Sequence, residues 1–100
     1  MANKPLNRRY MDAVAQQGCH VCSALGYGYS PAELHHIRDG QGMSQRSSDY
    51  LVVPLCAQHH RLGGGGVAIH AGQRQFENLY GTELDLLAMT IAKGFGERHG

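Results

Sequence analysis

The most constraining feature of the sequence is two pairs of potential metal ligands with the same internal spacing. Cys19 and Cys22 are separated by two residues, and so are Cys56 and His59. Two intervening residues let both side chains of a pair reach one ion from a tight turn, and three thiolates with one imidazole form a closed tetrahedral shell. The sequence therefore predicts a structural zinc site that ties the end of a first helix to the end of a second strand.

Two other interpretations of the cysteines remain open. They can be reduced, buried thiols beside an unrelated surface histidine, or the first pair can be a redox motif, although the βαβ pattern typical of such a motif is missing. Zinc explains more, because three cysteines cannot all pair as internal disulfides. A chain of 100 residues also has a marginal core, so an ion would supply much of its folding free energy.

The hydrophobic pattern predicts a small α+β domain. Apolar residues at four-residue spacing indicate an N-terminal helix over 5–17, with a stripe of Leu6, Tyr10 and Val14. The central part predicts short strands over 32–37 and 50–55 around a polar loop, then a helical turn over 56–62 that the four glycines 63–66 interrupt.

The C-terminal part predicts two helices, over 72–80 and 82–93. Thr82 is a good N-cap with Asp85 three residues on. The expected apolar face of the last helix is Leu84, Leu87, Ala88 and Ile91, and Gly94 and Gly96 are expected to stop that helix. We expect one domain, made of an N-terminal helix (1–18), a central zinc-stapled core (19–71) and C-terminal helices (72–100).

Composition sets wider bounds. A formal net charge of +1 does not by itself indicate a nucleic-acid partner. The first residues are polar and helical in character rather than a secretory signal, and no apolar run reaches the roughly 20 residues of a membrane span. We therefore expect a cytoplasmic protein without a membrane partner, in a compartment where thiols stay reduced.

Seven histidines in this chain suggest a second site. His35 and His36 are adjacent on a predicted strand, so their rings leave opposite faces and different roles are the natural division. One of them would bind a second metal with His60 and His70, while the other acts as a general base on water. Glu33, on the same strand face as His35, would orient that ring.

An ordinary surface or core imidazole is the alternative for each histidine alone. It stands for the two remaining histidines, His20 and His99.

The residues Glu33–Ile37 (ELHHI) and Pro54–Arg61 (PLCAQHHR) resemble the HNH endonuclease superfamily, and the earlier CxxC resembles its zinc-knuckle subgroup. A further similarity, over roughly residues 19–92, is to the phage recombination-enhancement (Ref) nucleases, which are RecA-dependent. The resemblance implies a ββα-metal fold with flanking N-terminal and C-terminal helices.

The resemblance also implies roles for the histidines. His35, His60 and His70 resemble the ligands of a catalytic metal, and His36 resembles the general base. Magnesium or manganese is the ion implied, whereas an all-imidazole shell by itself favours a softer ion such as zinc. The implied reaction is hydrolysis of a phosphodiester bond.

Three features depart from the family pattern. The HNH asparagine has no clear counterpart, and Asp49 is the nearest candidate. The glycine run displaces His70 from the usual short helical spacing. A long basic N-terminal arm is replaced by only three basic residues, which are Lys4, Arg8 and Arg9.

Phosphate contacts are expected from Arg38, Arg46 and Arg61, because guanidinium groups pair well with phosphate oxygens. Simple solvation of these side chains is the alternative.

These features favour a phage- or prophage-encoded DNA endonuclease in the bacterial cytoplasm, with DNA and a RecA filament as partners and a monomeric or weakly dimeric state. Two alternatives remain: a zinc-stapled nucleic-acid-binding module without catalysis, and an accessory protein of a recombinase.

Overall fold

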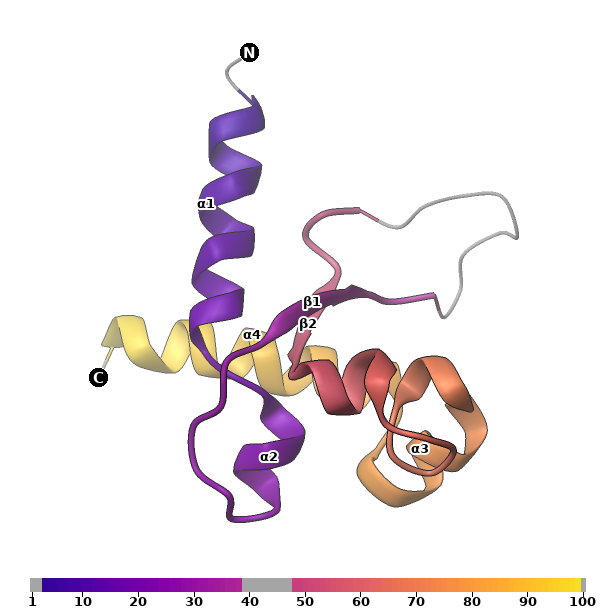
Figure 1. The fold of residues 1–100 in the computed structure, drawn as a ribbon. Helices are drawn as coiled ribbons and strands as arrows, with labels where there is room; N and C mark the ends of the chain where they lie inside the picture. The colour runs from indigo at the N-terminus through magenta and orange to yellow at the C-terminus, as the bar shows by residue number, and fades with distance from the viewer. Residues whose placement is uncertain (1–2, 39–47, 100) are drawn as a thin grey trace.

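The computed structural model describes residues 3–38 and 48–99 and has a small α+β fold (Figure 1). The helices, strands and helical turn expected from the sequence occur in the expected order, with two further short helices that the sequence did not predict. The elements are α1 (Asn3–Gln16), α2 (His20–Ala24), β1 (Glu33–His36), β2 (Val52–Leu55), the π-helical turn η1 (Gln58–Leu62), the 3-10 turn η2 (Ile69–Ala71), α3 (Gln73–Tyr80) and α4 (Glu83–His99).

The two strands form an antiparallel hairpin at the centre of the molecule. Glu33 pairs with Leu55 and His36 pairs with Val52. Every residue of β2 is buried, and Pro54 is tolerated because a two-stranded sheet leaves each strand one free edge. The core around this hairpin combines side chains from the strands, η2, α3 and α4. Its fully buried or nearly buried members include Val53, Leu55, Ile69, Phe76, Leu86 and Leu87.

Helix α1 packs its C-terminal half against the hairpin, and its N-terminal half projects away from α4 (Figure 1). Val14 is buried, and the Tyr10 hydroxyl donates a hydrogen bond to the Tyr50 carbonyl at 3.1 Å. Gly18 turns the chain toward the first cysteine with a φ of 83°. A Cβ at this position would lie 2.7 Å from the Tyr29 ring, so both the backbone angle and the close packing favour glycine.

Helix α4 differs from the sequence prediction in its length and in its buried face. It continues through Gly94 and Gly96 to His99, so the expected stop at these glycines is wrong. The expected apolar face is also wrong, because three of its four residues (Leu84, Ala88 and Ile91) are exposed. The face that packs inward consists of Glu83, Leu86, Leu87 and Thr90.

This inward face is one position out of phase with the most apolar stripe, and it carries two polar residues. The Thr90 hydroxyl donates a hydrogen bond to the Leu86 carbonyl at 2.8 Å, so it is not left unpaired in the core. The Glu83 carboxylate lies against His35 of β1. None of the helices within residues 3–38 and 48–99 has both the length and the hydropathy needed to cross a membrane.

Candidate metal centre

The structure brings the four predicted zinc ligands together in one cluster that is buried except at Cys56, called here the thiolate cluster (Cys19, Cys22, Cys56 and His59). Cys19 is the N-cap of α2, where its sulfur accepts a hydrogen bond from the Cys22 amide at 3.4 Å. This cap places Cys22 on the first turn of the helix. Cys56 follows β2, and His59 lies three residues on in η1, so that both face the same side of a helical turn.

The spacing within the thiolate cluster fits a tetrahedral zinc ion. Zn–S bonds of about 2.3 Å place tetrahedral ligand atoms about 3.8 Å apart. The Cys22 and Cys56 sulfurs are 3.7 Å apart. His59 Nδ1 lies 3.2, 3.6 and 3.9 Å from the sulfurs of Cys56, Cys22 and Cys19. Four ligand atoms at these separations form a closed shell, which is the arrangement of a structural zinc site.

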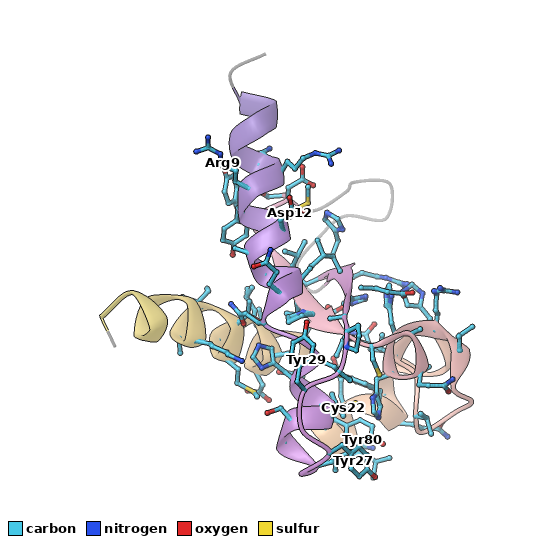
Figure 2. All side chains as sticks on the ribbon, turned by 60° about the vertical axis from the view of Figure 1, so that its left-hand side comes forward. Arg9, Asp12, Cys22, Tyr27, Tyr29 and Tyr80 are labelled. Carbon is cyan, nitrogen blue, oxygen red and sulfur yellow. The ribbon has the colours of Figure 1, made fainter. Side chains whose placement is uncertain are left out.

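The electrostatics of the thiolate cluster also fit a cation. Burial raises the pKa of the Cys19 thiol to about 11, so a bare thiolate is unfavourable there and a divalent cation would offset that cost. Burial lowers the pKa of His59 below its ordinary value. This keeps the imidazole neutral, as a metal ligand must be. Tyr80 packs beside it, with a ring-centre distance of 5.4 Å, and lies near Cys22 in Figure 2.

A second group of potential ligands, the histidine trio, consists of His35, His60 and His70. His35 is buried on β1, whereas His60 lies in η1 directly after the zinc-ligand candidate His59. The glycine run 63–66 reverses the chain, with Gly66 at a φ of 83°, so that η2 folds back beside η1. His70 is thereby brought next to His60 although ten residues separate them in sequence.

The geometry of the histidine trio also fits a divalent ion. Ring nitrogens at adjacent positions around an ion with bonds of about 2.1 Å lie about 3.0–3.4 Å apart, and His60 Nε2 and His70 Nε2 are 3.1 Å apart. The ring of His35 lies edge-on to both, at centre distances of 5.3 and 5.4 Å. Three ligands leave coordination positions open, and His70 is exposed, so this site is accessible from solvent.

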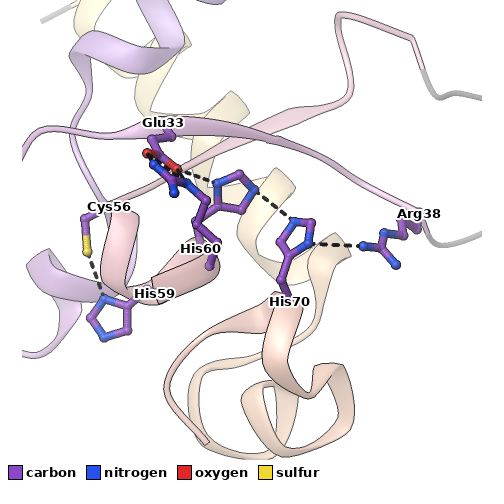
Figure 3. A network of polar contacts seen from close by, with 7 residues as sticks. Glu33, Arg38, Cys56, His59, His60 and His70 are labelled. Carbon is purple, nitrogen blue, oxygen red and sulfur yellow. Dashed lines mark hydrogen bonds and ion pairs between the residues drawn. The ribbon is translucent and has the colours of Figure 1, made fainter. Parts of the chain in front are cut away.

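Glu33 braces the trio, but through a different histidine from the one expected. Its carboxylate accepts a hydrogen bond from His60 Nδ1 at 2.8 Å, so the prediction that it orients His35 is wrong. The same carboxylate pairs with Arg61 at distances down to 2.7 Å. These bonds from Arg61 and His60 lower the pKa of Glu33 to about 2. Glu33 therefore stays ionised and holds His60 with Nε2 turned toward His70 (Figure 3).

His70 is tuned toward its neutral form. Partial desolvation of the ring where it faces the site, together with the neighbouring rings of His60 and His35, lowers the pKa of His70. Its Nδ1 lies 3.4 Å from the guanidinium of Arg38 (Figure 3). A neutral imidazole at neutral pH has a lone pair to give to a metal.

His36 follows His35 on β1 but turns to the other side of the strand, as the alternation of strand side chains requires. Its Nε2 lies 2.9 Å from Asp49 Oδ1, and both side chains are partly exposed. Asp49 comes just before β2, at the position where the sequence offered the nearest counterpart of a family asparagine. The pair leaves His36 Nδ1 as the nitrogen with a lone pair.

Glu83 is a site residue that sequence reasoning missed. Its carboxylate lies 2.6 Å from His35 Nε2, with His35 only 3% exposed and Glu83 fully buried. The sequence alone gave Glu83 no role, because the most apolar stripe of that helix points elsewhere. The structure shows that Glu83 shares the buried face of the helix with Leu86, Leu87 and Thr90.

The arginines expected to contact phosphate have different surroundings. Arg38 is exposed at the end of β1, beside His70. Arg61 is exposed but is held by Glu33 through both carboxylate oxygens. Arg46 lies outside the described residues. Arg9 and Asp12 are on the projecting helix α1 (Figure 2).

Comparisons with known proteins match most of the chain. The family model described as "Recombination enhancement, RecA-dependent nuclease" matches residues 4–93. The chain is also 32% identical over 84 residues to the "Uncharacterized protein YdfU" of Escherichia coli (strain K12), covering 82% of this chain. The chain spans only 21% of that relative's length. No match to a solved structure was found. Because the family match runs from α1 through both ligand clusters into α4, the chain belongs to the recombination-enhancement, RecA-dependent nuclease family.

Proposed function

We propose that this protein is a metal-dependent DNA endonuclease with an HNH-type (ββα-metal) centre. The observation that carries the proposal is that His36 directly follows His35, a member of the histidine trio, on β1. The trio gathers three imidazole nitrogens around open coordination positions, while the adjacent His36 is braced by a carboxylate and has one nitrogen to act as a base. Family membership supports nuclease chemistry.

His35, His60 and His70 are the proposed ligands of the catalytic ion, which is Mg²⁺ or Mn²⁺, with Zn²⁺ as the ion that imidazoles favour. A bound divalent cation would polarise the scissile phosphate and stabilise charge on the leaving oxygen. The thiolate cluster holds a structural Zn²⁺ and fixes the direction of η1. Because His59 and His60 are consecutive, the thiolate cluster positions a ligand of the histidine trio.

His36 is the proposed general base. Asp49 accepts the hydrogen bond from Nε2–H and favours the tautomer with a lone pair on Nδ1. His36 Nδ1 then takes a proton from water while the water oxygen bonds to phosphorus. The bond from phosphorus to the 3′ oxygen breaks, and that oxygen takes a proton from solvent. The Asp49 carboxylate stabilises the imidazolium that forms.

Arg38, beside the trio, is the best-placed phosphate contact. Arg61 can take this role only by sharing or leaving Glu33, and Arg46 is proposed from the sequence alone. RecA dependence, as the family description states it, would supply a second partner besides DNA. We further propose a phage or prophage origin, action in the bacterial cytoplasm, and a monomer or weak dimer.

A plasmid-nicking assay tests the proposal. Wild-type protein is compared with His36→Ala in Mg²⁺ or Mn²⁺, with and without RecA and single-stranded DNA. Since a positioned general base contributes about 10²- to 10⁴-fold, cleavage should fall by at least the lower figure while metal content stays constant. Equal cleavage by the variant would contradict the role of His36. Cleavage without RecA would separate nuclease activity from RecA dependence.

A further inference from the structure

We propose that Glu83 is a positioning residue that sets the metal affinity of the histidine trio through His35. This inference rests on the proposed function, because it assumes that the trio holds a divalent ion. It adds a residue from α4, 48 positions along the chain from His35, to a site otherwise built from the hairpin and the two turns that follow it.

Glu83 and His35 are in direct contact. Glu83 Oε2 lies 2.6 Å from His35 Nε2, and both side chains are removed from solvent. The other oxygen, Oε1, accepts a hydrogen bond from the backbone amide of Arg38 at 2.8 Å. Glu83 thus holds the ring of His35 and the end of β1 at the same time.

The first turn of α4 directs the Glu83 carboxylate toward His35. The Thr82 hydroxyl accepts from the Asp85 amide at 3.0 Å, and the Asp85 carboxylate accepts from the Thr82 amide at 3.0 Å. This reciprocal cap fixes the first turn of α4. Glu83 is the first residue of that helix, where the peptide dipoles favour a negative charge, and Leu86 and Leu87 bury the same face.

The Glu83 carboxylate sets the tautomer of His35. A carboxylate accepts hydrogen bonds and does not donate them, so His35 carries its proton on Nε2. Its lone pair is then on Nδ1, which is the nitrogen left to bind an ion. A carboxylate behind a metal-binding histidine fixes both the tautomer and the direction of the ring, and it raises the basicity of the ligand.

A second carboxylate, that of Glu33, braces His60 in a more exposed position. Glu33 is 34% exposed and shares its carboxylate with Arg61. Solvent and Arg61 therefore weaken its hold on the ring, whereas the Glu83–His35 contact is dry. Burying a carboxylate costs free energy that well-packed apolar residues would not, so packing alone does not account for Glu83 at this place.

The experiment compares Mn²⁺ binding to zinc-loaded wild type, Glu83→Gln and the matched control Glu77→Gln by isothermal titration calorimetry. Glu77 lies on α3, where its carboxylate accepts a hydrogen bond from Gln73 at 3.0 Å. We expect Glu83→Gln to bind Mn²⁺ about 10- to 100-fold more weakly, as losses of such partners do, and Glu77→Gln to match wild type. Equal affinity in all three proteins would overturn the inference.

Nitrogen-15 NMR of the histidine rings adds a readout that needs no variant. In zinc-loaded wild type we expect His35 as the Nε2–H tautomer, and on addition of diamagnetic Cd²⁺ we expect the ion on Nδ1. An Nδ1–H tautomer, or an ion bound at Nε2 in place of the Glu83 contact, would overturn the positioning role even if Glu83→Gln does not fold.

The two proposals fail in different ways. If wild type binds no Mn²⁺, the metal centre of the proposed function fails and this inference falls with it. If wild type and Glu83→Gln bind Mn²⁺ equally and wild type still cuts DNA, only the inference falls.

Discussion

The thiolate cluster and the histidine trio are neighbours in sequence and in space, but they differ in how far their ligands are closed off from solvent. Cys19, Cys22 and His59 are at most 7% exposed, and four ligands close the shell. In the trio, His70 is exposed, and three rings converge within residues 3–38 and 48–99. A closed thiolate shell suits an ion that stays for the life of the fold, whereas an open imidazole shell suits an ion that meets a substrate.

The link between the two regions is the pair His59 and His60. One helical turn sends the first ring to the sulfurs and the second to His70 (Figure 3). The comparison therefore predicts a one-way dependence. Loss of the thiolate cluster, the sealed site, should destroy the histidine trio, the open site. Loss of the histidine trio should leave the thiolate cluster intact.

The largest expected effect comes from breaking the sealed region. Cys22→Ser should abolish cooperative thermal unfolding and Mn²⁺ binding together, because structural zinc contributes about 10–16 kcal/mol of apparent binding free energy in small zinc domains. Circular dichroism and calorimetry would measure both. The exposed neighbour Ser23→Ala is the control. A folded Cys22→Ser protein that still binds Mn²⁺ would refute the dependence.

Breaking the open region should have a selective effect. His60→Ala removes a ligand, so Mn²⁺ affinity should fall by more than the about 10- to 100-fold expected for losing an outer partner, and DNA nicking should fall with it. Zinc content and unfolding temperature should stay close to wild type. Loss of the bound zinc in this variant would mean that the two sites are not separable.

A smaller effect is expected when only the base loses its brace. Asp49→Asn should lower the nicking rate by about tenfold or more. This loss should be smaller than the ~10⁴-fold loss for the buried aspartate of serine-protease triads, because Asp49 is 27% exposed. Mn²⁺ affinity should not change, since Asp49 contacts His36 and not the trio's rings. A matching loss of Mn²⁺ affinity would place Asp49 in the metal site instead.

The smallest effect is the pH dependence of stability. Burial, with Lys93 nearby, lowers the pKa of His20, so below its ordinary value of 6.5 the unfolded chain takes up the proton more readily than the folded one. This contribution to stability is therefore complete above pH 6.5 and is lost as the pH falls through the lower, folded pKa. His20→Gln should flatten the fall in unfolding temperature between pH 7.5 and 5.5. An unchanged slope would contradict the assignment.

The sealed region was predictable from sequence because its geometry is local. Each ligand pair is set by one tight turn, and only the meeting of the two turns needed the fold. The grouping of His35 with His60 was also predicted. The partner of Glu33 was not, because strand alternation gives the face of a carboxylate but not which ring η1 brings to it.

The role of α4 could not be read from its pattern. The stripe beginning at Leu84 is the more apolar one, but burying Glu83 and Thr90 is possible because each has a hydrogen-bond partner in the fold. Those partners lie on another element or one turn away, and hydropathy does not register them. The position of His70 likewise depended on how the glycine run folds back, which the spacing alone did not determine.

The most direct test of a sealed and an open site side by side is metal analysis after dialysis against a mild chelator, followed by titration with Mn²⁺. The account predicts one zinc per chain retained by both wild type and His60→Ala, and one further Mn²⁺ bound by wild type alone. A protein that retains no zinc, or a His60→Ala variant that binds Mn²⁺ as wild type does, would contradict it.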